Sequence, residues 1–194
     1  MKSKKTVNIA LVGNPNTGKT SLFNQLTGLT QKVGNYPGIT VDKKQGTCKL
    51  GAEQTAIITD LPGTYSINPT SLDESIVLET LLDNDHENYP DIVVVVAEVE
   101  NIKRNLLLFT QVKDLKIPTL LVVNMADQMD RKGISIDIEA LKTILNTEIV
   151  LISARKREGI EALKEALLRY KAFDTTPLQS ISDKIDKAYF EKIK

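Results

Sequence analysis

The sequence of 194 residues is long enough for one well-buried α/β domain with a short remainder, and too short for two full domains. Its 25 Lys and Arg residues balance its 25 Asp and Glu residues, which argues against the basic surface of a nucleic-acid-binding protein and against a membrane-surface protein. A single cysteine, Cys48, excludes an internal disulfide and agrees with a cytosolic protein, and the longest apolar run, residues 92–97, is far shorter than a membrane helix requires.

Apolar runs predict the strands of a mostly parallel sheet. Runs bounded by turn residues lie at residues 7–12, 55–59, 92–97, 119–123 and 149–152. They contain Val, Ile and Leu without polar alternation, which is typical of parallel strands buried on both faces. Residues 41–50 alternate between polar and less polar side chains and are expected at the sheet edge. These strands predict an α/β fold with a six-stranded sheet and helices on both faces.

Helix-period segments connect most of these strands. We expect helices at residues 19–27, 73–82, 102–115, 136–145 and 160–171. Ser135 and Gly159 directly precede two of these patterns and are expected start signals. Two loops that carry glycine and proline, residues 29–40 (the first loop) and 61–72 (the second loop), interrupt the regular order. Long irregular loops in an α/β domain are more often functional than not.

A phosphate-binding motif joins the first strand to the first helix. It fits the pattern G-x-x-x-x-G-K-[ST] and reads Gly13-Asn14-Pro15-Asn16-Thr17-Gly18-Lys19-Thr20. Its glycines let backbone N–H groups converge on an anion, and the helix dipole favours negative charge there. We expect Lys19 on the β- and γ-phosphates, Thr20 on Mg²⁺ and Ser21 among the nucleotide contacts. The alternative is an incidental glycine-rich turn, whose chance match is roughly 1%.

A second motif supplies the metal and γ-phosphate contacts. It ends the strand at residues 55–59 and reads Asp60-Leu61-Pro62-Gly63. The carboxylate there suits Mg²⁺ held through water, and the Gly63 N–H suits a γ-phosphate. Thr40, preceded by Gly38 and Ile39, stands where a loop hydroxyl completes the Mg²⁺ shell. Neither motif is specific by itself.

Two further motifs indicate guanine. The first follows the strand at residues 119–123 and reads Asn124-Met125-Ala126-Asp127. A carboxylate there accepts hydrogen bonds from the N1–H and the exocyclic amine of guanine, a donor pair that adenine lacks. The alternative is that Asp127 only caps the helix that follows. The second motif, Ser153-Ala154-Arg155, offers a backbone N–H to the guanine O6. The order and spacing of all these elements predict a P-loop NTPase with a Ras-like G domain.

The motif set is specific enough to indicate a family. The segments GNPNTGKTSLFNQLTG, VGNYPGITVD, DLPGTYS, NMAD and SAR resemble the N-terminal cytosolic G domain of FeoB, the bacterial ferrous-iron transporter, among the TrmE-Era-like GTPases. The resemblance covers about residues 7–170. Two features indicate this family rather than GTPases in general. They are Met125, where most small GTPases carry lysine, and the loop at residues 33–38. Residues 97–100 depart from the V-D-A-T-N-like turn that is common in the family.

This resemblance implies a GTP-binding and slowly GTP-hydrolysing switch domain whose nucleotide state is coupled to a downstream transmembrane iron channel. It divides the chain into a G domain, residues 1–171, and the beginning of a helical, dissociation-inhibitor-like domain, residues 172–194, so we expect a piece of a longer protein. The implied setting is the cytoplasmic side of a bacterial cell membrane. The implied partners are guanine nucleotide, the downstream domains and a second copy of the chain, without nucleic acid. The alternatives are a free-standing assembly GTPase acting on ribosome or tRNA, and a non-catalytic nucleotide-binding scaffold.

The predicted catalytic set is incomplete compared with Ras. Thr64 stands where Ras-type enzymes carry a glutamine, and no arginine precedes Arg104, so we expect a turnover on the order of 10⁻³ to 10⁻⁴ per second. The resemblance implies that K⁺, held by the Asn16 side chain and the carbonyls of Gly34 and Tyr36, replaces an arginine finger. The alternative is that Asn16 only stiffens the phosphate loop. The expected catalytic residues are therefore Asn16, Lys19, Thr40 and Gly63. His86, in the polar run at residues 83–87, is expected in a solvated loop.

Overall fold

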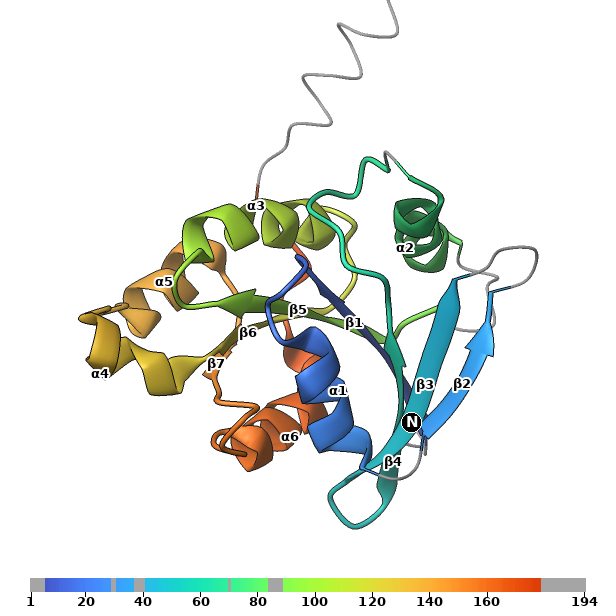
Figure 1. The fold of residues 1–194 in the computed structure, drawn as a ribbon, viewed down its shortest axis with the longest axis horizontal. Coiled ribbons are helices and arrows are strands. Elements are labelled where there is room, and N and C mark those ends of the chain that lie inside the picture. Colours follow the sequence, from blue (N-terminus) through green and yellow to red (C-terminus); the bar gives the residue numbers. More distant parts are fainter. Residues whose placement is uncertain (1–5, 29–30, 37–40, 70, 84–88, 179–194) are drawn as a thin grey trace, which may run out of the picture.

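Seven strands form one sheet at the centre of the molecule (Figure 1). The structure, a computed structural model, describes residues 6–28, 31–36, 41–69, 71–83 and 89–178. The strand order is β2 (Gln31–Asn35), β3 (Asp42–Leu50), β4 (Gln54–Asp60), β1 (Thr6–Gly13), β5 (Ile92–Glu98), β6 (Thr119–Asn124) and β7 (Ile149–Leu151). Parallel pairing joins β4, β1, β5, β6 and β7, whereas β3 runs antiparallel to both β2 and β4. The predicted α/β class and mostly parallel sheet are confirmed.

The central strands alternate between two hydrophobic cores. On β1, Ile9 and Leu11 face one core, whereas Ala10 and Val12 face the other. The first core lies against α1 (Lys19–Thr27) and α6 (Ile160–Leu168), and the second against α2 (Leu72–Leu82), α3 (Ile102–Lys113) and α5 (Ile138–Leu145). Figure 1 shows α1 and α6 on one side of the sheet and α2 and α3 on the other. Because both faces are covered, the strands need apolar side chains at every position.

The sheet has one strand more than the six predicted. The additional strand, β2, consists of Gln31–Asn35 inside the first loop, and its side chains are mostly exposed. An edge strand whose side chains face solvent needs no apolar alternation, so the sequence carries no signal for it. As a result, β3 is the second strand from the edge, and the expectation that residues 41–50 form the edge strand is wrong. Cys48 lies buried in β3, and burial raises the pKa of its thiol.

Most predicted helices are found, with differences at their ends. The bounds of α1 match the prediction, but α3 and α6 end earlier, and a 3₁₀ turn at Tyr170–Ala172 follows α6. Gly159 directly precedes α6 with a φ of 76°, as a start signal should. Ser135 does not start α5, because the Asp137 carboxylate accepts the Ala140 N–H at 2.9 Å and the helix begins at Ile138. Two short helices, η1 (Ala126–Gln128) and α4 (Met129–Lys132), were not predicted.

None of the helices in the described ranges is both long and apolar enough to cross a membrane. Most of the expected second domain, residues 172–194, lies outside the described residues.

Candidate functional site

The phosphate-binding motif forms a tight turn between β1 and α1. Gly13 ends β1, and a Cβ at this position would lie 2.7 Å from the Val96 carbonyl oxygen. Gly18 has a φ of 80°, and its Cβ would lie 2.2 Å from the Asn124 side chain. Asn16 is also left-handed, with a φ of 69°. The turn therefore requires glycine at both positions, as expected of a loop that brings its backbone close to a phosphate.

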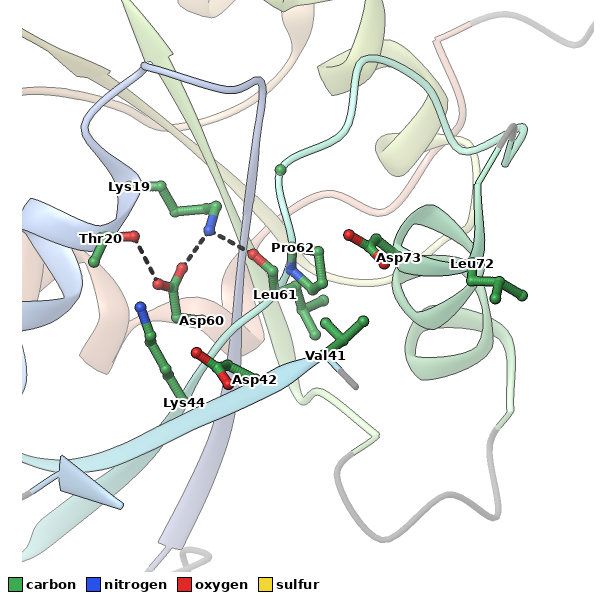
Figure 2. A pocket seen from close by; sticks show the side chains of 11 residues that line it. Lys19, Thr20, Val41, Asp42, Lys44, Asp60, Leu61, Pro62, Leu72 and Asp73 are labelled. Atoms are coloured by element: carbon green, nitrogen blue, oxygen red, sulfur yellow. Dashed lines mark hydrogen bonds and ion pairs between the residues drawn. The ribbon is translucent and has the colours of Figure 1, made fainter. Parts of the chain in front are cut away.

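At the phosphate end, the expected ligand-binding side chains bind one another. The Lys19 ammonium donates to Asp60 Oδ1 and to the Leu61 carbonyl, and the Thr20 hydroxyl donates to Asp60 Oδ2 at 2.9 Å (Figure 2). Lys19 is 8% exposed and Asp60 is 6% exposed, so little water competes for this ion pair. Asp60, at the end of β4, thus satisfies both side chains that were expected on the phosphates and on Mg²⁺.

Two pockets open around this cluster. One, of about 590 Å³, is lined by Lys19, Thr20, Asp60, Leu61, Pro62 and Gly63, together with Val41, Asp42, Lys44, Leu72 and Asp73. The other, of about 390 Å³, is lined by Lys19, Thr20 and Gly63 with Asn14, Pro15, Asn16, Gly18 and Ser21. The pockets share three residues, so they form one continuous region over the phosphate-binding turn.

Lys44 is a pocket cation that the sequence analysis missed. It lies directly opposite Asp60 in the antiparallel pairing of β3 with β4, and its side chain points toward Asp60 in Figure 2. The alternation along β3 could have placed Lys44 on the same face as Asp60, but only after the register of the two strands was known.

The second loop runs beside the phosphate-binding turn. The Thr64 N–H donates to the Gly13 carbonyl at 3.1 Å, and a Cβ on Gly63 would lie 3.2 Å from Pro15. Thr64 is fully buried, its hydroxyl donates to the Ser66 carbonyl at 2.6 Å, and Glu74 Oε1 lies 3.0 Å from that hydroxyl. The Thr64 side chain therefore faces the protein interior, where Ser66 and Glu74 occupy its hydroxyl.

At the base end, one buried amide connects three motifs. Asn124, at the end of β6, donates through Nδ2 to the Thr17 carbonyl at 2.9 Å and accepts the Ala154 N–H through Oδ1 at 3.0 Å. The Ser153 hydroxyl donates to Asp127 Oδ1 at 2.8 Å. Side-chain hydrogen bonds cap neither η1 nor α4, so the alternative that Asp127 serves as a helix cap is wrong. The fold therefore brings together the phosphate-binding motif, Asp127 and the segment of Ser153, Ala154 and Arg155.

The left-handed turn at Met125 makes this arrangement possible. Met125, directly after β6, has a φ of 65°, so the chain turns away from the direction of the strand. The next residue, Ala126, donates its N–H to the Ile152 carbonyl at 3.0 Å. This backbone hydrogen bond holds the start of η1 against the end of β7, and it places Asp127 beside Ser153.

The first loop is only partly described. Gly34 lies within β2, and Tyr36 packs in the core of α2 and α3, with its N–H donating to the Val41 carbonyl at 3.0 Å. The buried Tyr36 hydroxyl has no hydrogen-bond partner among the described residues, and burial, helped by the charge of Asp60, raises the pKa of Tyr36 to about 12. Neither pocket is lined by Gly34 or Tyr36, so the structure does not bring these predicted K⁺ ligands together with Asn16 around one pocket. The predicted ligands Gly38, Ile39 and Thr40 lie outside the described residues, as does His86.

Known proteins of similar sequence have the same fold. The chain matches the family described as Ferrous iron transport protein B over residues 7–167. It is 45% identical over 169 residues to the Fe(2+) transporter FeoB of Leptospira biflexa, which covers 87% of this chain and 24% of that protein. The G domain of the T. maritima FeoB iron transporter is 38% identical with a TM-score of 0.78, covering 86% of this chain and 99% of that chain. A mutant of S. thermophilus NFeoB bound to GDP is 37% identical with a TM-score of 0.77, covering 86% of this chain and 63% of that chain.

The extent of these matches defines what the chain shares with its relatives. The chain spans about a quarter of the length of the curated relatives it matches, but nearly the whole of the solved T. maritima G domain. The family match covers all the motifs from Gly13 to Arg155. The chain therefore belongs to the ferrous iron transport protein B family, and the region it shares with that family is the G domain.

Proposed function

We propose that this chain binds GTP, hydrolyses it slowly, and acts as the nucleotide-dependent switch domain of a ferrous-iron transport protein. The observation that carries the proposal is the buried Asn124 amide, which ties the Thr17 carbonyl in the phosphate-binding turn to the Ala154 N–H in the base-binding segment. Because one side chain fixes both ends of the site, phosphate recognition and guanine recognition act on the same ligand. The GDP bound to the S. thermophilus NFeoB mutant supports this assignment.

Asp127 reads the guanine base in this proposal. The Ser153 hydroxyl donates to Asp127 Oδ1, which fixes the orientation of the carboxylate. An ionised carboxylate only accepts hydrogen bonds, so it pairs with the N1–H and amine of guanine and not with adenine. Selectivity for guanine over adenine follows from this single residue.

We propose that the phosphates bind when Lys19 exchanges its contacts with Asp60 and Leu61 for contacts with phosphate oxygens. In the structure, the Lys19 ammonium donates to Asp60 and to the Leu61 carbonyl. The β- and γ-phosphate oxygens are stronger anionic acceptors, and the backbone N–H groups of the turn and the start of α1 add to their stabilisation. Lys19 therefore leaves Asp60 when the nucleotide enters, and Asp60 becomes available for another cation.

The donor set beside Lys19 fits Mg²⁺. The Thr20 hydroxyl and the Asp60 carboxylate are hard oxygen donors that already lie 2.9 Å from each other. We assign Thr20 as a direct ligand, Asp60 as a ligand through water and Thr40 as a third ligand from the first loop. When bound there, Mg²⁺ neutralises negative charge on the β- and γ-phosphate oxygens.

In this proposal, hydrolysis depends on Gly63, which positions the γ-phosphate, and on a K⁺ ion near Asn16, which supplies positive charge. The Gly63 N–H binds the γ-phosphate, whereas the inward-facing Thr64 hydroxyl leaves the attacking water without a side chain in the place of the Ras glutamine. The exposed Asn16 amide lies in the phosphate pocket, and its oxygen is a hard donor that suits K⁺. Gly34 and Tyr36 do not line that pocket in the structure, so this proposal requires the first loop to move before their carbonyls bind the same ion. A K⁺ ion at that position supplies the positive charge that an arginine finger supplies elsewhere.

The remaining elements of the proposal concern the longer protein. The curated relatives are Fe(2+) transporters about four times as long as this chain. We infer that residues 172–194 begin a helical domain and that the nucleotide state of the G domain regulates iron transport through the segments that follow, in the cytoplasm at the cell membrane. A homo-oligomer belongs to the same proposal.

Nucleotide binding and phosphate release together test the proposed function. Titration with fluorescent GTP, GDP and ATP should give comparable affinities for GTP and GDP and an affinity for ATP weaker by about 100-fold or more, since ATP leaves Asp127 unpaired. Phosphate release should occur at a slow, saturable rate. Equal affinities for GTP and ATP would overturn the base assignment, and tight GTP binding without phosphate release would make the chain a non-catalytic scaffold.

A further inference from the structure

The helix α3 holds the second loop from outside the nucleotide site. The guanidinium of Arg104 lies over the ring of Tyr65, 4.2 Å from its centroid. Gln111, two helical turns further along, accepts the Ile67 N–H through Oε1 at 3.2 Å. Tyr65 and Ile67 follow Gly63 by two and four residues, so both contacts act on the part of the loop that leads away from the γ-phosphate contact.

α3 is a firm support for these contacts. Its inner face is buried in the core through Leu108, Phe109 and Val112. Near its start, the Asn105 side chain accepts the Glu98 N–H at 2.9 Å, which joins the helix to the end of β5. A loop that is held against such a helix has few positions available, and these positions are set by the side chains of the helix.

The other end of α3 holds the last described segment of the chain. The Lys113 ammonium, which is buried, donates to the carbonyls of Asn146 and Asp174, and burial lowers the pKa of Lys113. Asp114, directly after the helix, accepts the Leu178 N–H through Oδ1 at 3.0 Å. The helix that contacts the second loop through Arg104 and Gln111 therefore also holds residues 174–178 at its C-terminal end.

We propose that Arg104 and Gln111 are positioning residues that set the location of Gly63 for the γ-phosphate, and that α3 links this location to the segment at residues 174–178. The inference rests on the proposed function, in which Gly63 binds the γ-phosphate. Arg104 acts through the Tyr65 ring and does not touch the nucleotide, so it is no arginine finger. The proposed link runs through α3 because its contacts with the second loop and with residues 174–178 belong to one helix, and the coupling between them is what the experiments below measure.

A double-mutant cycle between Arg104 and Tyr65 tests the positioning role. Arg104→Ala and Tyr65→Leu should each lower kcat for GTP about three- to fivefold, the size that an exposed cation–π contact supports, while the Kd for GDP stays unchanged. The double variant should be no slower than either single variant, because both remove the same contact. Tyr65→Phe should keep the wild-type kcat, since the contact uses the ring and not the hydroxyl.

The control is Lys103→Ala, which removes an exposed cation from the neighbouring position of the same helix. It should leave kcat at the wild-type value. Additive effects of the two substitutions, or an equal loss of GDP affinity, would overturn the positioning role. If the wild-type chain released no phosphate from GTP, the proposed function and this inference would fail together, whereas an additive cycle in an active chain removes only the inference.

Hydrogen exchange tests the link to residues 174–178. The exchange rate of the Leu178 amide should differ between the GDP-bound chain and the chain bound to a non-hydrolysable GTP analogue. Arg104→Ala should remove most of that difference, while Lys103→Ala should keep it. Equal Leu178 exchange in the two nucleotide states of the wild-type chain would contradict a link through α3.

Discussion

At the base end of the site the side chains are bound to the fold, whereas at the phosphate end they are bound to one another. Asn124 is held by two backbone groups of neighbouring segments, and Ser153 fixes Asp127. By contrast, Lys19 and Thr20 both bind Asp60, so these three polar groups satisfy one another. The base end is therefore held by the fold, whereas the phosphate end must exchange its contacts for the proposed nucleotide to bind.

This difference assigns separate roles to the two ends. A preformed base end contributes affinity and selectivity that do not depend on the number of phosphates, because nothing there has to move. A phosphate end that exchanges contacts responds to the ligand, and we expect the second loop beside it to change position when the nucleotide binds. The four predictions that follow test this division, from the largest expected effect to the smallest.

Removal of Lys19 should have the largest effect. Lys19→Ala deletes the cation expected on the β- and γ-phosphates, and a hydrogen bond to a charged group contributes about 1.5–3 kcal/mol. We expect the Kd for GTP to rise about 100-fold or more, and turnover to be lost, as measured by fluorescent-nucleotide titration and phosphate release. Lys49→Ala, at an exposed position of β3, is the matched control. A GTP affinity within threefold of wild type would contradict the exchange at Lys19.

Removal of Asp127 should affect the base end alone. Asp127→Ala leaves the guanine donors unpaired, which costs about 1–3 kcal/mol, or about 5- to 150-fold in affinity. GTP and GDP should weaken by the same factor, since the base end does not sense the phosphates. Isothermal titration with GTP, GDP and ATP measures this, and a variant that still preferred GTP over ATP would remove Asp127 from base recognition.

The monovalent cation should change turnover more than binding. We expect K⁺ to accelerate GTP hydrolysis about tenfold over Na⁺, a barrier difference of about 1.4 kcal/mol, because the added charge matters most in the transition state. Asn16→Ala should remove most of this difference and leave GDP affinity nearly unchanged. Phosphate release measured in KCl and in NaCl provides the comparison, and an Asn16→Ala variant that still responded to K⁺ would place the charge elsewhere.

The smallest effect is expected at Tyr36, whose buried hydroxyl has no hydrogen-bond partner in the part of the chain that the structure describes. Tyr36→Phe should stabilise the nucleotide-free chain by about 1 kcal/mol, since an unsatisfied buried polar group is removed. The pKa of Tyr36 is raised to about 12 in the folded chain, so on raising the pH its phenol ionises first in the unfolded chain. This ionisation has no effect on stability well below pH 10, and it lowers the free energy of unfolding as the pH rises toward 12.

Wild type should therefore lose stability relative to Tyr36→Phe between pH 9 and pH 11. Urea denaturation of both proteins at the two pH values measures the change. If the difference in unfolding free energy between them stayed constant, Tyr36 would titrate normally in the folded chain.

The sequence predicted the parts of the fold that depend on local patterns. Uninterrupted apolar runs such as residues 92–97 became strands buried on both faces, and the glycine spacing placed the phosphate-binding turn before α1. The strand β2 was missed because an exposed edge strand needs no apolar pattern, and Ser135 was mistaken for the start of α5 because Asp137 provides the cap instead.

The residues of the site were predicted by type and spacing, but their contacts depend on tertiary structure. The sequence placed Asn124 in a guanine motif, yet only the strand order brings it to Thr17 and Ala154. Lys44 became part of the pocket through the register of β3 with β4. Nothing in the sequence was a reason to assign Arg104 a role, because this residue lies outside both loops. The fold places its helix, α3, against the second loop, where Arg104 contacts Tyr65.

A crystal structure of the chain with a non-hydrolysable GTP analogue and Mg²⁺ tests the central claim most directly. The account predicts that the Lys19 ammonium leaves Asp60 for the phosphate oxygens, while the hydrogen bonds from Asn124 to Thr17, from Ala154 to Asn124 and from Ser153 to Asp127 remain as they are. A bound nucleotide with Lys19 still paired to Asp60, or a base end whose contacts had been rebuilt around guanine, would contradict it.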